Sequence, residues 1–115
     1  MAVSAEYLEY VRDQLGRLGA ISVRQMFGGA GVYCDGLFFA IVVDDVLYFK
    51  VDATNQTDYE AAGSGPFVYE SDGKSVTMGY WEVPADVLES RDEIEAWARK
   101  AMGVALRAKK KKKGK

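Results

Sequence analysis

One stretch of the chain, residues 24–51, restricts the possible fold more than any other feature. Within it, seven consecutive apolar residues, Leu37–Val43, lie between the polar pairs Asp35-Gly36 and Asp44-Asp45. Asp-Gly between apolar runs is a strong hairpin signal, because a type I′ turn needs a positive φ at both central residues. The second pair lacks glycine and is a weaker signal. We therefore expect three antiparallel strands, with the middle strand buried on both faces.

Amphipathic helices are expected at both ends of the chain. Residues 3–18 carry apolar side chains at helical spacing, and Ser4 is a suitable N-cap. Near the other end, Ser90 and Glu93 form a capping-box pattern in front of a second apolar stripe. The pattern predicts a final helix that ends at about Ala108.

The remaining elements complete an α+β fold. We expect a short strand over Ile21–Met26, a short helix ending at Ala62, and a hairpin of Phe67–Glu70 with Ser75–Val83. One helical turn is expected over residues 84–89. The predicted architecture is an antiparallel β-sheet of about five to six strands, a meander plus a hairpin, packed by the N- and C-terminal helices.

Charge divides the chain into an acidic body and a basic end. Residues 1–106 hold eight Lys or Arg against 17 Asp or Glu, a net charge of −9, whereas residues 107–115 carry +7. We expect one domain over residues 1–108 and a disordered, lysine-rich tail over 109–115. Such a body repels nucleic acid, but the tail could attract phosphates without reading sequence. Candidate nucleic-acid contacts are Lys109, Lys110, Lys111, Lys112 and Lys113.

The residue inventory argues against an enzyme. The chain has no histidine, which removes the commonest general base and most transition-metal sites, and its single cysteine, Cys34, has no flanking cation. We assign no catalytic residue, no metal and no cofactor. No export signal or membrane span is visible, so a reducing, cytoplasmic setting is expected.

A glycine segment, residues 27–31, leaves two interpretations open. Three glycines in four positions could cradle a phosphate or another small ligand through backbone amides. However, the segment lacks the GxGxxG and Walker patterns, and a strand rather than a helix follows it. The structural interpretation is a bend or bulge that turns the chain into the strand containing Tyr33.

Several motifs together resemble the N-terminal domain of the TfoX/Sxy family of competence regulators. They are the segment from Arg24 to Tyr33, the strand Leu47–Asp52 and the run Tyr80–Pro84. The resemblance covers roughly residues 3–106. It implies a non-enzymatic regulator of natural transformation that acts as a coactivator with the cyclic-AMP receptor protein. Full-length members of the family carry a second, helical domain, so this chain is expected to be a stand-alone, single-domain form.

We therefore expect a binding module whose contact region combines rare cations with glycines and aromatic residues. The alternative for these aromatic side chains is the protein core. A transcription factor or another protein is the expected partner, and the chain is expected to be a monomer or a homodimer. The candidate partner-binding residues are Arg24, Phe27, Gly28, Gly29, Gly31, Tyr33, Lys50, Tyr80 and Trp81.

Overall fold

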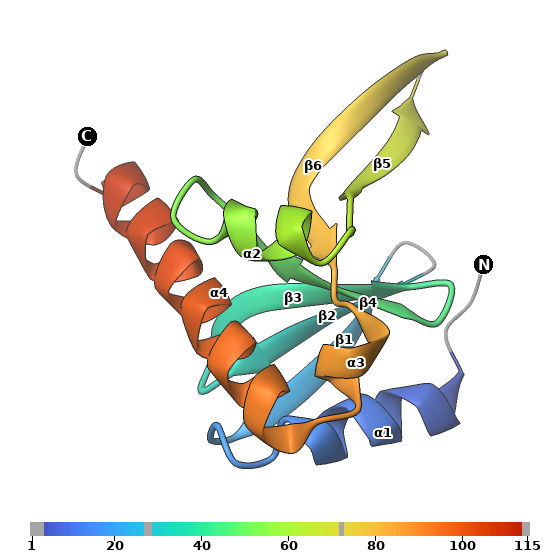
Figure 1. Cartoon of the computed structure of the whole chain (residues 1–115), viewed down its shortest axis with the longest axis vertical. Coiled ribbons are helices and arrows are strands. Elements are labelled where there is room, and N and C mark those ends of the chain that lie inside the picture. The colour runs from blue at the N-terminus through green and yellow to red at the C-terminus, as the bar shows by residue number, and fades with distance from the viewer. Residues whose placement is uncertain (1–3, 27–28, 72, 114–115) are drawn as a thin grey trace.

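The computed structural model describes residues 4–26, 29–71 and 73–113, and its centre is one antiparallel sheet. The six strands lie in the order β1-β2-β3-β4-β6-β5 (Figure 1). The first four form a meander, and β5 with β6 forms a hairpin attached to β4. The predicted α+β class is confirmed. The strands are β1 (Ile21–Met26), β2 (Gly29–Cys34), β3 (Leu37–Val43), β4 (Val46–Lys50), β5 (Pro66–Ser71) and β6 (Lys74–Glu82).

Both tight turns of the meander have the conformation that their sequence predicts. Asp35 and Gly36 have φ values of 51° and 85°. Asp44 and Asp45 have φ values of 52° and 58°, although neither is glycine. Positive φ at both central residues matches the right-handed twist of the flanking strands, so these turns hold β2, β3 and β4 in register.

The described helices lie on one side of the sheet. They are α1 (Ala5–Gln14), α2 (Gln56–Ala61), α3 (Ala85–Leu88) and α4 (Arg91–Lys113). Figure 1 shows α1, α3 and α4 on the same side of the meander, with α4 crossing it. Helix α2 reaches that side through the Tyr59 ring, which contacts Trp81 of β6 and Trp97 of α4. The helices therefore form one layer and the sheet forms a second layer.

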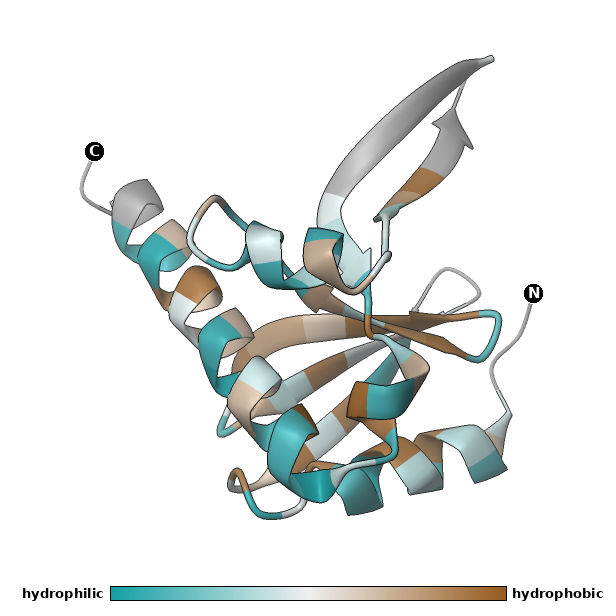
Figure 2. Ribbon diagram, in the orientation of Figure 1, coloured by the Kyte–Doolittle hydropathy of each residue, from teal (hydrophilic) through white to brown (hydrophobic). Residues whose placement is uncertain are grey.

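The core lies between these two layers. Its largest buried side chains include Phe39, Phe49, Leu15 and Ile94. Figure 2 shows hydrophobic residues along the strands of the meander and hydrophilic residues on the outer turns of α1 and α4. This arrangement is the one expected for amphipathic helices that cover one face of a sheet.

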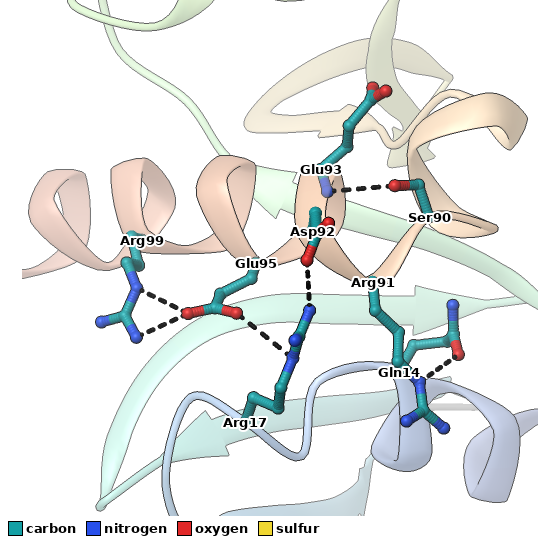
Figure 3. Close-up of polar contacts among 8 residues, drawn as sticks. All are labelled: Gln14, Arg17, Ser90, Arg91, Asp92, Glu93, Glu95 and Arg99. Carbon is teal, nitrogen blue, oxygen red and sulfur yellow. Dashed lines mark hydrogen bonds and ion pairs between the residues drawn. The ribbon is translucent and has the colours of Figure 1, made fainter.

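A polar cluster connects the two terminal helices (Figure 3). The buried side chain of Gln14 donates a 2.8 Å hydrogen bond to the carbonyl of Leu88 and accepts one from Arg91. Arg17, just after α1, forms ion pairs with Asp92 at 2.7 Å and Glu95 at 3.4 Å. Because the surface pairs are exposed, we attribute the stronger stabilisation to the buried Gln14 amide.

The helix boundaries differ from the sequence-based expectation at two points. Helix α1 ends at Gln14 rather than at residue 18, and its N-cap Ser4 is confirmed by a 3.1 Å hydrogen bond from the Tyr7 amide. Ser90 likewise caps α4 by accepting a hydrogen bond from the Glu93 amide. Helix α4, however, continues through Lys113, so the expected disordered tail is helical over residues 109–113. Lysine has a good helix propensity and favours the negative C-terminal end of a helix.

The expectation that β3 is buried on both faces is wrong. Phe39, Ala40 and Val42 are buried, but the other residues of the strand are only partly buried. The described helices cover one face only, and the opposite face of the meander has no described helix over it. No helix in the described part of the chain is long and apolar enough to cross a membrane.

Candidate interaction surface

The uncovered side of the sheet, which we call the open face, carries aromatic rings and, among the side chains that the structure describes, two cations. Strand alternation places Arg24, Tyr33, Phe38, Lys50 and Tyr80 on this face. They come from five strands that are separated in sequence but adjacent in the sheet. The meander and the attachment of β6 to β4 therefore bring together residues that lie up to 56 positions apart.

These five side chains form a continuous chain of contacts, which we call the aromatic chain. The Arg24 guanidinium lies 5.7 Å from the centroid of the Tyr33 ring, and that ring stacks on Phe38 with centroids 5.0 Å apart. Phe38 in turn contacts Tyr80 at 6.1 Å. The Lys50 ammonium lies 4.9 Å from the Tyr80 centroid. Cations are attracted to the negative face of an aromatic ring, and this attraction holds Arg24 and Lys50 at the two ends of the aromatic chain.

A β-bulge explains why Phe38 joins this surface. Val32 pairs with Ala40, but the next residue, Tyr33, pairs with Phe38, so Phe39 is the extra residue. Phe39 and Ala40 are both buried on the helix side. The bulge therefore places two neighbouring residues in the core and Phe38 beside Tyr33 on the open face.

The arrangement of the rings limits what the open face can bind. Arg24 lies over the Tyr33 ring and Phe38 is stacked on it, so π-faces of this aromatic chain are already occupied. Base recognition on a sheet requires free ring faces for stacking. Burial raises the pKa of Tyr80, with Tyr33 adding to the effect, so its hydroxyl stays protonated at neutral pH. Tyr80 itself is only 7% exposed, so what a partner can reach on this surface is the exposed Arg24 and the partly buried Tyr33, Phe38 and Lys50.

The structure brings together some of the predicted partner-binding residues and separates others. Arg24, Tyr33, Lys50 and Tyr80 share the open face. Trp81 does not, because it pairs with Phe49 and lies on the helix side near Tyr59. Residues 80 and 81 are consecutive in a strand, so alternation forbids both from facing one side.

The glycine segment belongs to the sheet where it is described. Phe27 and Gly28 lie outside the described residues. Gly29 and Gly31 are in β2 and pair with residues of β1 and β3. A Cβ atom at Gly29 would lie 2.6 Å from the carbonyl oxygen of Val42, so close strand approach explains that glycine.

Sequence reasoning missed Phe38 as a surface residue. Its position, two residues after Gly36 in an apolar run, suggested a core side chain. The available signal was its alternation with the core residue Phe39, but an apolar run of seven gives no indication of which face is covered.

The lysine cluster is remote from the core of the domain. Lys109 and Lys110 are exposed on the last described turns of α4. Two residues earlier, Arg107 contacts Asp52 at 3.4 Å and Thr54 at 2.8 Å, which ties the helix to the loop before α2. The lysines therefore extend a helix that is anchored at Arg107.

The other candidate chemical groups have structural partners. Cys34 is buried, and this burial raises the pKa of its thiol. Asp45 accepts a hydrogen bond from the Ser4 amide. Among the described residues, no group of three or more His, Cys, Asp or Glu side chains could hold a metal ion. A groove of about 530 Å³ lies between the β3–β4 turn and β5, and its lining, which includes Val46 and Phe67, excludes the glycine segment.

The fold and this surface define a two-layer α+β domain with helices on one side of an antiparallel sheet. Sequence comparison matches residues 13–105 to the TfoX N-terminal domain, and the chain belongs to this family. It is also similar to Protein Sxy of Escherichia coli strain K12, with 27% identity over 100 residues. The match covers 85% of this chain and 47% of that relative, so the chain spans about half the length of the curated protein it resembles.

Proposed function

We propose that the chain is a non-enzymatic protein-binding module in transcriptional regulation, and that its partner binds the open face. The observation that carries this proposal is the aromatic chain, which lies between two cations on a sheet face without a described helix over it. Apolar surface rimmed by charge is typical of protein interaction sites. Membership in the TfoX N-terminal family supports a competence-related regulatory role, and such a regulator would work in the cytoplasm.

The test is affinity capture from native cells with the intact chain as bait. The double variant Arg24→Ala/Lys50→Ala removes the two cations of the aromatic chain. The matched control, Arg99→Ala/Lys100→Ala, removes two exposed cations of α4 on the helix side. We expect the wild type and the control to recover the same transcription factor or polymerase subunit, and the open-face variant to lose about tenfold or more of it. Equal recovery by all three proteins would refute the assignment of the open face.

A second candidate function is non-specific attraction of nucleic acid by the end of α4. The observation that favours it is the continuation of the helix through Lys113, which places successive lysines on a helix anchored by Arg107. Lysines on a helix can neutralise phosphates without reading bases. This function would use the tail and leave the open face free for a protein.

A further inference from the structure

One line of residues crosses the open face at right angles to the strands. Arg24 pairs with Gly31, Gly31 with Ile41, Ile41 with Tyr48, and Tyr48 with Glu82. Directly opposite residues in antiparallel strands point to the same face, so all five belong to the open face. We call them the cross-strand row. At about 4.8 Å per strand, Arg24 and Glu82 are roughly 19 Å apart at its two ends.

The cross-strand row is complementary to its own reverse. Its ends carry opposite charges, since Arg24 and Glu82 are both exposed. Between them, the residue without a side chain, Gly31, corresponds by reversal to the large ring of Tyr48. Ile41 is at the centre, on β3, and is partly buried. A second row placed over the first in the opposite order would therefore pair cation with anion at both ends. It would also set each Tyr48 ring against Gly31, which has no side chain and is itself buried by its neighbours.

We propose that two copies of the chain pack open face against open face about a two-fold axis that runs parallel to the strands at β3. This axis puts Arg24 of each copy opposite Glu82 of its partner and Tyr48 of each copy opposite the partner's Gly31. The inference rests on the proposed function, because both assign binding to the open face. It adds that a second copy of the chain can occupy this face.

A second copy fits this face better than a partner of uniform charge. An acidic segment lying along the row would be attracted by Arg24 at one end and repelled by Glu82 at the other. A basic segment would be attracted by Glu82 and repelled by Arg24. Arg24 can serve both contacts, because its guanidinium lies over the Tyr33 ring and remains exposed. Phe67 also supports the Tyr48 ring edge-on at 4.9 Å, which holds that ring in position for a partner.

The size of the face predicts a reversible dimer. The five strands pair over three to six residues, so at about 4.8 Å per strand and about 3.4 Å per residue the face is roughly 24 Å across and roughly 10–20 Å along the strands. Burial of both copies then removes on the order of 1,000 Å² from water, at the lower limit for a specific interface. Packed sheets are rotated by about 30° relative to each other, so the rows of the two copies coincide near Ile41 and diverge towards their ends. The long side chains of Arg24 and Glu82 can bridge this separation.

Charge reversal tests this arrangement directly. In a homodimer of Arg24→Glu, both end contacts become repulsive, and the same holds for Glu82→Arg. In a mixture of the two variants, a heterodimer restores both attractive contacts. By sedimentation equilibrium over a concentration series, we expect each single variant to weaken dimerisation by about tenfold or more. The equimolar mixture and the double variant Arg24→Glu/Glu82→Arg should return to the wild-type dissociation constant.

Control variants separate the specific contacts from general charge effects. Arg12→Glu on α1 and Glu89→Arg after α3 change exposed charges on the helix side by the same amounts, and we expect both to dimerise like the wild type. A wild type that is monomeric at millimolar concentration would overturn the proposal. It would also be overturned if single reversals had no effect or if the mixture did not recover dimerisation.

The same proteins distinguish failure of this inference from failure of the proposed function. The double reversal should dimerise, but it presents an altered face to any other protein, so its capture of a regulator from cells should stay low. If Arg24→Glu and Glu82→Arg dimerise like the wild type but no longer capture the regulator from cells, the proposed function is supported and the proposed dimer is refuted. Recovery of dimerisation in the mixture, with no regulator captured by any variant, would support the dimer and refute the function.

Discussion

The ring of Tyr59 packs edge-on against Trp97, with the two centroids 4.7 Å apart and the planes 71° apart. This contact joins α2 to α4, and the Tyr59 side chain is 1% exposed. Its hydroxyl is buried and has no hydrogen-bond partner among the described residues. Burial also raises the pKa of Tyr59. The ring therefore stabilises the domain, whereas the hydroxyl carries an uncompensated desolvation cost.

We accordingly expect Tyr59→Phe to increase the free energy of unfolding by about 1 kcal/mol, because it keeps the ring and removes the unpaired hydroxyl. Urea denaturation measures the change. The matched variant is Tyr7→Phe, which should lose about 1 kcal/mol because the Tyr7 hydroxyl hydrogen-bonds the backbone of Leu47. A loss of stability in Tyr59→Phe would show that the hydroxyl has a partner, such as a bound water.

Tyr7 also predicts how stability depends on alkaline pH. Burial raises the pKa of Tyr7 to about 12, although its hydrogen bond with the Leu47 backbone acts in the opposite direction. The unfolded tyrosine ionises near pH 10. The unfolded state therefore loses its proton first, so stability is complete below pH 10 and falls as the pH rises from 10 to 12.

Because Tyr7 is only partly buried, solvent screens part of this effect, and we expect a decrease of about 1–2 kcal/mol across this interval, with a contribution in the same direction from Tyr59. Urea denaturation at a series of pH values measures it, and Tyr7→Phe should flatten the slope. An unchanged slope in that variant would contradict the assignment to Tyr7.

The buried amide of Gln14 should be essential for the junction of the terminal helices. Gln14→Ala leaves the Leu88 carbonyl and the Arg91 side chain without this partner. We expect a loss of about 1–3 kcal/mol in the free energy of unfolding. Gln56→Ala is the control, because the Gln56 amide donates to Glu60 one turn along the same short helix, at an exposed position, and it should change stability by less than about 0.5 kcal/mol. Similar values for both variants would refute the role of Gln14.

Backbone conformation, rather than space, should decide the tolerance of two glycines to alanine. A Cβ atom added to Gly36 or to Gly65 would meet no described atom within 4 Å, but only Gly36 has a positive φ, of +85°. We expect Gly36→Ala to cost about 1–2 kcal/mol and Gly65→Ala to be neutral or slightly stabilising. Thermal unfolding of both variants measures the difference. Equal melting temperatures would show that the Asp35-Gly36 turn tolerates an L-residue.

The lysine end of α4 predicts salt-sensitive binding to nucleic acid. We expect the intact chain to bind duplex DNA weakly. The logarithm of its binding constant should fall with the logarithm of the salt concentration with a slope no steeper than about −6. A form ending at Ala108 should lose this binding. Arg24→Ala/Lys50→Ala should bind DNA like the wild type, because its changes lie on the open face. Fluorescence anisotropy at several salt concentrations measures the slope. Binding that is insensitive to salt would exclude the tail as the contact.

Local signals in the sequence predicted the elements and most of their connections. The Asp35-Gly36 turn and the caps at Ser4 and Ser90 depend on contacts within a few residues, which sequence order specifies directly. For this reason the sheet, the terminal helices and the family could be recognised from the order of the residues. Alternation in β6 puts Tyr80 and Trp81 on opposite faces, so the grouping of both residues in one predicted contact region was wrong.

Only the tertiary structure decided which face of the sheet the helices cover. The seven apolar residues of β3 do not indicate whether helices pack on one face of the sheet, on the other or on both, and they do not reveal the bulge. The hydrophobic effect depends on the apolar area that is buried and not on the direction in which a side chain points. The packing of α1 and α4 on one side buried Phe39 and left Phe38 beside Tyr33 on the other. The sequence by itself determined the local structure, whereas long-range packing determined the open face and the row from Arg24 to Glu82.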